Sequence, residues 1–349
     1  MTGFGALAGG GLAWCEGGEV VDLSGLGDVF ARPTLNDLLA GGRTAWQEAI
    51  AAARAHDGPR VAERDARVRL PFDVADYVDF YSSLEHATNL GRMFRPDQEP
   101  LLPNWRWLPV GYHGRAGSVV VSGTDVIRPH GQRKAPNEDA PTFGPSRRLD
   151  FELELGFVVG VPTELGEPVP VEAFADHVFG LLLVNDWSGR DIQAWEYVPL
   201  GPNLGKSFQT SVSAWVSPLA LLEGAHVEAP AQDPSPLPHL AGGRDWALDV
   251  ALEVELNGET VSRGNASTLY WTLPQQLAHA TSNGAPLRTG DLMASGTISG
   301  AEPGSEGSMI ELFRGERFLA DGDEVVLRGR AGNGVDLGEV RGRVLPARA

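Results

Sequence analysis

Hydrophobic positions along the chain favour short β-strands over long helices. Apolar residues gather in short runs separated by turn-forming residues, and helical periodicity is scarce. The clearest runs are "SVVVSG", "FELELGFVVGV", "VFGLLLVND", "VALEVELNGE" and "DEVVLRGR". Two or three helices are expected to interrupt these strands, one of them near residues 272–283, and the proline-rich residues 228–243 predict a loop. With 44 Gly and 25 Pro spread throughout, the pattern predicts a mainly β or α+β protein.

The N-terminal part has its own pattern. "GLAWCEGGEVVDLS" predicts a hairpin of two strands around a Gly-Gly turn. "TLNDLLAGGRTAWQEAIAAARAH" predicts a helix in two pieces, broken at Gly41 and Gly42. Residues 56–75 are charged and loop-like, so we place a boundary there. The sequence therefore predicts a small N-terminal module, residues 1–70, and a larger one, residues 71–349.

Composition and charge exclude several classes of function. A formal charge of −18 argues against a nucleic-acid surface or a polybasic membrane patch, although a locally positive site for an anionic substrate stays compatible with it. Cys15 is the one cysteine, so no intramolecular disulfide is possible. The N-terminus lacks a basic leader, and no apolar run reaches the roughly 18 residues of a membrane span. We expect a soluble, cytoplasmic protein that binds neither nucleic acid nor membranes.

Two acids in the run "FELELGF" are candidates for cation binding. Glu152 and Glu154 stand two apart in a strand pattern, so their carboxylates point to the same side of the strand. Paired carboxylates repel unless a cation or a proton lies between them, which favours a site for a hard cation. The alternative is an edge strand with one face in water.

The segment 181–208 adds a second set of candidates. An apolar strand runs directly into Asp186, and the end of such a strand is a common place for a ligand or catalytic group. Arg190, Gln193 and Tyr197 follow with the i, i+3, i+7 spacing of one helical face. The alternative is a solvated helix beside structural tryptophans.

The stretch "GPNLGKS" is not a nucleotide-binding loop. Gly201 and Gly205 have three residues between them where the Walker pattern needs four, and Pro202 removes an amide. Lys206 is nevertheless notable, because Lys134 is the only other lysine among the 28 Lys and Arg residues. A retained lysine in an arginine-rich chain suggests a need for an ammonium group.

The stretch "DFYSSLEHATNLG" combines an acid, two hydroxyls and a histidine. Ser82 and Glu85 have the spacing of a capping box, which predicts a short helix from Ser83 to near Gly91. His86 would then lie in the first turn. A lone histidine is more often structural, so His86 becomes a catalytic candidate only if the other carboxylates gather near it.

Five long motifs, in order, resemble the fumarylacetoacetase branch of the fumarylacetoacetate hydrolase family. They are "DFYSSLEHATNLGRMFR", "LLPNWRWLPVGYHGRAGSVVVSG", "LDFELELGFVVG", "NDWSGRDIQAWEYVPLGPNLGKSF" and "LMASGTISGAEPGSEGSMIEL". The resemblance covers residues from about 70 to the C-terminus and continues more faintly through the N-terminal module. It implies an SH3-like N-terminal β-barrel, a C-terminal β-roll and a homodimer. The N-terminal module and the loop after Leu312 look shorter than is usual in the family.

The resemblance also implies a role for particular residues. The metal ligands, for Ca²⁺ or Mg²⁺, would be Asp79, Glu152, Glu154 and Asp186. The resemblance also implies that a magnesium can be held near Asp186, Lys206 and Thr210, so Thr210 counts among the expected metal-binding residues. His86 would be the general base, oriented by Glu311, while Arg190, Gln193 and Lys206 would stabilise the oxyanion and the carbanion leaving group. Tyr81, Arg95, Tyr112, Gln193, Tyr197 and Thr297 would line the substrate pocket. No organic cofactor is implied.

The activity implied by the resemblance is hydrolysis of the carbon–carbon bond of 4-fumarylacetoacetate, the last step of tyrosine and phenylalanine catabolism. One alternative is a related hydrolase or lyase of the same family that acts on another acylpyruvate or dioxo acid. Another is a non-catalytic Ca²⁺-dependent binding module, which would leave His86, Lys206 and Glu311 without a joint role.

Overall fold

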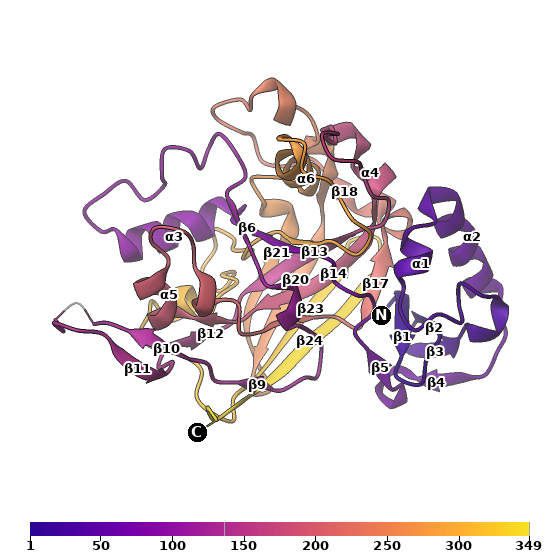
Figure 1. Cartoon of the computed structure of the whole chain (residues 1–349), viewed down its shortest axis with the longest axis horizontal. Coiled ribbons are helices and arrows are strands. Elements are labelled where there is room, and N and C mark those ends of the chain that lie inside the picture. Colours follow the sequence, from indigo (N-terminus) through magenta and orange to yellow (C-terminus); the bar gives the residue numbers. More distant parts are fainter. Residues whose placement is uncertain (136, 349) are drawn as a thin grey trace.

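Two β-sheets that pack against each other organise the chain (Figure 1). The computed structural model describes residues 1–135 and 137–348. The larger sheet has 13 strands, with the main order β4-β3-β2-β1-β17-β14-β13-β22-β6-β7. The second sheet has five strands in the order β21-β20-β23-β24-β9. The predicted mainly β, α+β class is confirmed, with parallel and antiparallel pairs mixed in both sheets.

The strands of the larger sheet come from most of the chain. They are β1 (Gly3–Leu7), β2 (Leu12–Glu16), β3 (Glu19–Asp22), β4 (Arg60–Ala62), β5 (Val68–Arg69), β6 (Tyr77–Phe80), β7 (Gly111–His113), β8 (Val119–Val121), β13 (Leu153–Val159), β14 (Val178–Asp186), β16 (Thr210–Val212), β17 (Trp215–Pro218) and β22 (Leu292–Ala294). The second sheet contains β9 (Val126–Ile127), β20 (Val250–Leu256), β21 (Glu259–Asn265), β23 (Glu324–Ala331) and β24 (Asp336–Leu345).

Shorter elements surround the sheets. Three two-stranded pairs are β10 (His130–Arg133) with β11 (Thr142–Pro145), β12 (Leu149–Asp150) with β15 (Ser188–Gly189), and β18 (His226–Val227) with β19 (Ala247–Leu248). The helices are α1 (Asn36–Leu39), α2 (Gly42–Ala55), α3 (Leu84–Phe94), α4 (Phe174–His177), α5 (Arg190–Glu196), α6 (Leu273–Thr281) and α7 (Met309–Leu312). In Figure 1, α3 and α5 lie at the opposite end of the molecule from α1 and α2.

Strand β14 is apolar on both faces because each face packs on a different core. Leu181 and Leu183 belong to the core between the two sheets, which also contains Leu252 of β20. Leu182 and Val184 point the other way and join a second core with residues of the N-terminal module. Side chains alternate along a strand, so the continuous apolar run "VFGLLLV" is what a strand buried on both faces requires.

The N-terminal predictions are largely confirmed. Glu16 pairs with Glu19 across the Gly-Gly turn, as the hairpin prediction requires, and the helix is split into α1 and α2. β1 also pairs with β17, so this module continues the large sheet. Among the described residues the pairings form an open series, and the closed SH3-like barrel stays a prediction.

The helix predictions after residue 70 are confirmed with one correction. α6 lies within the expected 272–283 segment, and α3 covers the expected helix. The N-cap of α3, however, is Ser83 and not Ser82: the Ser83 hydroxyl accepts from the His86 amide at 3.3 Å. Ser82 instead accepts from the Gln276 side chain at 3.0 Å, so a long-range contact decides between two adjacent serines. No helix in the described residues is both long and apolar enough to cross a membrane.

Shortening Leu183 should destabilise the packing of the two sheets. The side chain is fully buried between them and contacts the neighbourhood of Gly329 in β23. We expect Leu183→Ala to lower the free energy of unfolding by about 2–5 kcal/mol, measured by urea titration. Leu165→Ala is the control, because Leu165 is 82% exposed, and it should change little. Equal effects of the two variants would contradict this assignment of the core.

Candidate metal centre and active site

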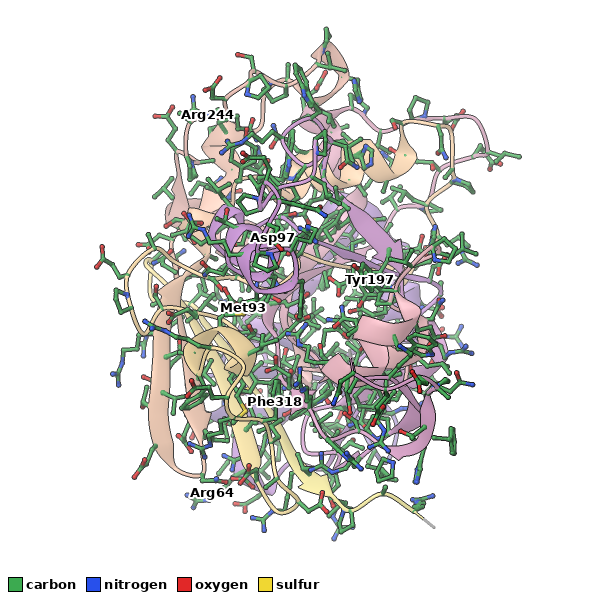
Figure 2. The ribbon with its side chains drawn as sticks, turned by 90° about the vertical axis from the view of Figure 1, so that its left-hand side faces the viewer. Arg64, Met93, Asp97, Tyr197, Arg244 and Phe318 are labelled. Carbon is green, nitrogen blue, oxygen red and sulfur yellow. The ribbon has the colours of Figure 1, made fainter. Side chains whose placement is uncertain are left out.

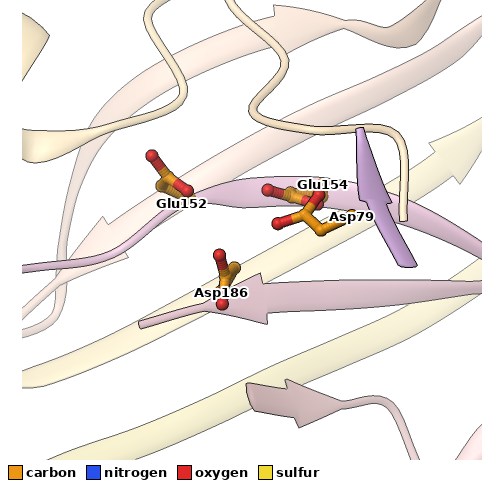
Figure 3. Close-up of side chains that lie close together, drawn as sticks. All are labelled: Asp79, Glu152, Glu154 and Asp186. Carbon is orange, nitrogen blue, oxygen red and sulfur yellow. The ribbon is translucent and has the colours of Figure 1, made fainter. Parts of the chain in front are cut away.

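Four buried carboxylates lie close together on the large sheet (Figure 3). Asp79 lies in β6, Glu154 in β13 and Asp186 in β14, while Glu152 immediately precedes β13. One oxygen from each residue lies within 4.8 Å of the others. Glu152 and Glu154 share the face of β13 that carries Val158, because all three positions differ by even numbers. Since β13 lies between β14 and β22, the alternative of a wetted edge strand was wrong.

The carboxylates on the β6 side of the cluster lack enough partners. Oδ1 of Asp79 and Oε1 of Glu154 are buried without a hydrogen bond. Burial, followed by the charge of Asp186, raises the pKa of Asp79 well above its usual range. Burial and the charges of Asp79 and Asp186 do the same to Glu154. Unpaired buried carboxylates are costly, and an all-oxygen donor set suits a hard divalent cation, so these residues fit one.

Two cations pair with the other side of the cluster. The Lys206 ammonium donates to Asp186 Oδ2 at 2.6 Å and also to Glu152 Oε2. Arg190 donates to Glu152 Oε1 at 2.6 Å. Burial alone would raise the pKa of Glu152, but Arg190 and Lys206 outweigh it and hold that pKa below its usual range. Glu152 is therefore ionised and held between a guanidinium and an ammonium.

Tyr112 and Thr210 complete the surroundings of Asp186. The Tyr112 hydroxyl lies 2.6 Å from Asp186 Oδ2 and 2.8 Å from Asp79 Oδ2. Thr210 in β16 donates to Asp186 Oδ1 at 3.3 Å. Both residues, which the sequence suggested for substrate and metal binding, therefore contact the carboxylates directly.

His86 and Glu311 form a buried pair beside this cluster. The distance from His86 Nδ1 to Glu311 Oε2 is 2.6 Å, and from His86 Nε2 to Glu152 Oε1 it is 3.8 Å. Burial would raise the pKa of Glu311, but interaction with His86 and the Ser308 hydroxyl lowers it to about 2. An ionised Glu311 fixes the Nδ1–H tautomer of the imidazole and leaves Nε2 on the side of the carboxylates.

A cavity of about 370 Å³ adjoins the His86 side of the site, and it contains four of the expected substrate-binding residues. Tyr81, Arg95, Gln193 and Tyr197 all line it. The Tyr81 ring also packs edge-on against His86, with centroids 5.3 Å apart. In Figure 2 this side of the molecule faces the viewer, with Met93 of α3 and Tyr197 after α5 at either side.

Thr297 lies next to the cluster but is not bonded to it in the described residues. Its side chain is buried just after Gly296, whose amide donates to Glu154 Oε2 at 3.2 Å. Gly296 has a φ of +77°, and a Cβ there would meet the Phe80 carbonyl oxygen at 2.1 Å. Only glycine fits at this position, so it fixes the backbone that contacts Glu154.

Sequence reasoning missed the residues that hold Glu311 and Arg190. Asn89 donates to Glu311 Oε1 at 3.0 Å, and Ser299 and Ser308 donate to Oε2 at 3.0 and 2.6 Å. Asp150 accepts from Arg190 Nε at 2.8 Å. Asn89 stands three residues after His86 on the same helix, a spacing that could have indicated it. Ser299 and Asp150 carried no comparable local signal.

The fold is mainly β, and the buried carboxylate cluster could hold a metal ion beside the His86–Glu311 pair, which is an arrangement typical of enzyme active sites. Residues 76–345 match the family described as "Fumarylacetoacetate (FAA) hydrolase C-terminal". The chain belongs to the fumarylacetoacetate hydrolase family.

Curated relatives and solved structures agree with this membership. The chain is 51% identical to the fumarylacetoacetase of Caenorhabditis elegans, over 92% of this chain and 85% of that protein. It is 47% identical to the human fumarylacetoacetase, over 92% and 85% of the two chains. The structure of a maleylpyruvate hydrolase from Sphingobium in complex with manganese(II) and pyruvate has the same fold, with a TM-score of 0.59, 17% identity and coverage of 99% and 100%.

Divalent cations should stabilise the folded protein through the four carboxylates. A cation that binds only the folded state adds about 2.7 kcal/mol at 100 times its Kd. We therefore expect Mn²⁺, Mg²⁺ or Ca²⁺ to raise the Tm of chelator-treated protein. Asp79→Asn and Glu154→Gln should each remove most of this rise, measured by differential scanning fluorimetry. Asp291→Asn, which changes a buried carboxylate outside the cluster, should keep it. A full rise in both cluster variants would contradict the site.

The ionised Glu311 should contribute stability that depends on pH. Its pKa in the folded protein is lowered from 4.5 to about 2, so this contribution is complete above pH 4.5 and is lost as the pH falls toward 2. The stability difference between wild type and Glu311→Gln should therefore shrink on acidification below 4.5. Urea unfolding at several pH values measures it, with exposed Glu164→Gln as the control. A difference independent of pH would contradict the assignment.

Proposed function

We propose that this chain is a divalent-cation-dependent fumarylacetoacetase. It adds water across the carbon–carbon bond between the two parts of 4-fumarylacetoacetate and releases fumarate and acetoacetate. The observation that most directly supports this proposal is the buried His86–Glu311 pair beside the four carboxylates, with His86 Nε2 at 3.8 Å from Glu152 Oε1. Support comes from curated relatives of that name that are 45–51% identical over more than nine-tenths of this chain. The reaction is the last step of tyrosine and phenylalanine catabolism.

His86 acts as the general base. Its Nδ1–H donates to ionised Glu311, so Nε2 is the nitrogen that can accept a proton from water. As the imidazolium forms, the Glu311 carboxylate stabilises its charge. Asn89, Ser299 and Ser308 hold that carboxylate in place, and this keeps the ring oriented through the proton transfer.

The difficult part of the reaction is the departure of a carbon leaving group. A divalent cation bound by Asp79, Glu152, Glu154 and Asp186 would supply Lewis-acid stabilisation of the negative charge that a 1,3-diketone develops. The attacking water oxygen bonds to the carbonyl carbon, and the electron pair of the broken carbon–carbon bond leaves on acetoacetate, which is then protonated. The chain's own donors must stabilise the charge on both sides of this bond.

Arg190, Gln193 and Lys206 are placed to supply those donors. Arg190 Nη1 donates to the Gln193 side-chain oxygen at 3.2 Å, which leaves the Gln193 NH₂ group free to donate into the cavity that Gln193 lines. Lys206 is buried and charged, because Asp186 and Glu152 raise its pKa against the effect of burial. A preorganised donor to an oxyanion is worth about 3–4 kcal/mol in a site closed to water.

The remaining pocket residues suit a small dianion. In the cavity, Arg95 provides a charge for a carboxylate, and Tyr81 and Tyr197 provide hydroxyls, which reconciles an anionic substrate with a chain charge of −18. Tyr112 and Thr297 would contribute hydroxyls from beside the carboxylate cluster. Ca²⁺ or Mg²⁺ is the proposed resident ion, because all ligands are carboxylates, and no organic cofactor is needed.

The organisation of the protein is part of the same proposal. We place an SH3-like N-terminal module in residues 1–70, the catalytic β-roll in residues 71–349, and a cytoplasmic homodimer in solution. Family resemblance supports each of these points. Light scattering tests the dimer, which should have twice the 37.2 kDa mass of the chain.

Loss of the ultraviolet absorbance of fumarylacetoacetate tests the activity. We expect turnover that a chelator removes and that added Mg²⁺ or Ca²⁺ restores. His86→Ala should lower kcat by at least about 10²-fold while the cation-dependent rise in Tm remains, because the base lies beside the carboxylates but is not one of the proposed metal ligands. Faster turnover of acylpyruvates would favour a related hydrolase, and turnover unaffected by both treatments would overturn the proposal.

A further inference from the structure

Asp150 is a completely buried carboxylate whose four bonding positions are all filled. Oδ1 accepts from the amides of Phe151 and Met309, both at 2.8 Å. Oδ2 accepts from the amide of Ile310 at 3.2 Å and from Arg190 Nε at 2.8 Å. Its exposed fraction is 0%, so water does not share these bonds. Three backbone donors thus fix the carboxylate, and the carboxylate in turn fixes one side chain.

That side chain, Arg190, is the link between Asp150 and the reaction site. Its Nη2 donates to Glu152 at 2.6 Å, and its Nη1 donates to Gln193 at 3.2 Å. Because Nε donates to Asp150, each of the three guanidinium nitrogens has a defined hydrogen-bond partner. Because the guanidinium is planar, the hydrogen bond at Nε restricts the directions of the two remaining nitrogens.

The backbone donors come from the element that carries Glu311. Met309 and Ile310 are the first two residues of α7, and Glu311 is the third. Asp150 therefore holds the position of Arg190 relative to the same short helix that orients His86. Residues 150 and 309 are 159 positions apart in the chain, so this contact joins two distant segments.

We propose that Asp150 is a positioning residue for Arg190, and that through Arg190 it sets the direction of the donors to Glu152 and Gln193. This role rests on the proposed hydrolysis, in which Arg190 and Gln193 stabilise developing charge. An asparagine at this position cannot replace the carboxylate, because its NH₂ group would face two donors in either orientation. Residues that orient the groups acting at a metal site typically change activity about 10- to 100-fold when altered.

The first test compares two buried aspartates. Asp150→Asn should lower kcat about 10- to 100-fold with a smaller change in KM, because binding groups in the cavity remain. Asp291→Asn is the matched control: Asp291 also accepts a backbone amide and pairs with an arginine, Arg288, but lies outside the site. It should change stability and leave kcat within a fewfold. Equal kcat losses in the two variants would overturn the proposal.

The second test asks whether Asp150 acts through Arg190. The double variant Asp150→Asn with Arg190→Gln should have the kcat of Arg190→Gln alone, within a fewfold. Losses that multiply would overturn the proposal, because they would mean an effect independent of Arg190. If Asp150→Asn alone does not fold, the comparison of the double variant with Arg190→Gln still tests the proposal. The double variant can fold because it removes both charges of the buried pair.

Hydrogen exchange gives a readout without turnover. Asp150→Asn should increase amide exchange at Met309 and Ile310, and Asp291→Asn should not. Unchanged exchange at both amides would contradict the proposed contact. If wild type does not hydrolyse fumarylacetoacetate, the proposed function fails, while this exchange result still reports on Asp150 itself.

Discussion

Repulsion among buried carboxylates is the constraint around which this structure is arranged. The sheet order β14-β13-β22-β6 places Asp186, Glu154 and Asp79 on one face, and Glu152 joins them from the start of β13. In a medium of low polarity, such a group cannot remain charged without compensation. The chain supplies compensation unevenly: Lys206 and Arg190 contact Glu152, and Lys206 also contacts Asp186. By contrast, one oxygen of Asp79 and one of Glu154 have no hydrogen-bond partner among the described residues. This uneven compensation would favour an additional cation beside Asp79 and Glu154, as proposed above.

Two separate sets of hydrogen bonds orient the side chains of His86 and Arg190. On one side, Glu311 is held by Asn89, Ser299 and Ser308 and directs His86. On the other, Asp150 is held by amides and directs Arg190. Both sets of contacts involve α7, so the nitrogen proposed to accept the proton and the guanidinium proposed to stabilise charge are both positioned relative to the same helix. Such common support keeps the relative placement of reacting groups within the narrow limits that catalysis needs.

The sequence predicted what depends on local periodicity and left open what depends on long-range contact. The shared face of Glu152 and Glu154 follows from strand alternation, and the placement of Asp186 follows from the end of an apolar strand. The N-cap at Ser83 did not follow, because the local capping-box spacing to Glu85 favours Ser82, whereas the Ser82 hydroxyl is bonded to the distant Gln276. Asp150 was overlooked for the same reason: its partners in α7 lie far away in sequence. The two-sided burial of β13 likewise depends on the second sheet and on the N-terminal module, which no local pattern reveals.

The alternation of β13 limits how proteins built this way can diverge. Adding or deleting one residue near Glu154 would turn its carboxylate into the core between the sheets and bring Leu153 or Leu155 to the cation side, so length changes are forbidden there. The segments 95–110 and 197–205, which line or flank the cavity, contain no strand of the two large sheets, so a change in their length shifts no strand register. Selectivity for new diketo acids can thus evolve by loop exchange, while the strands that supply the acids stay as they are.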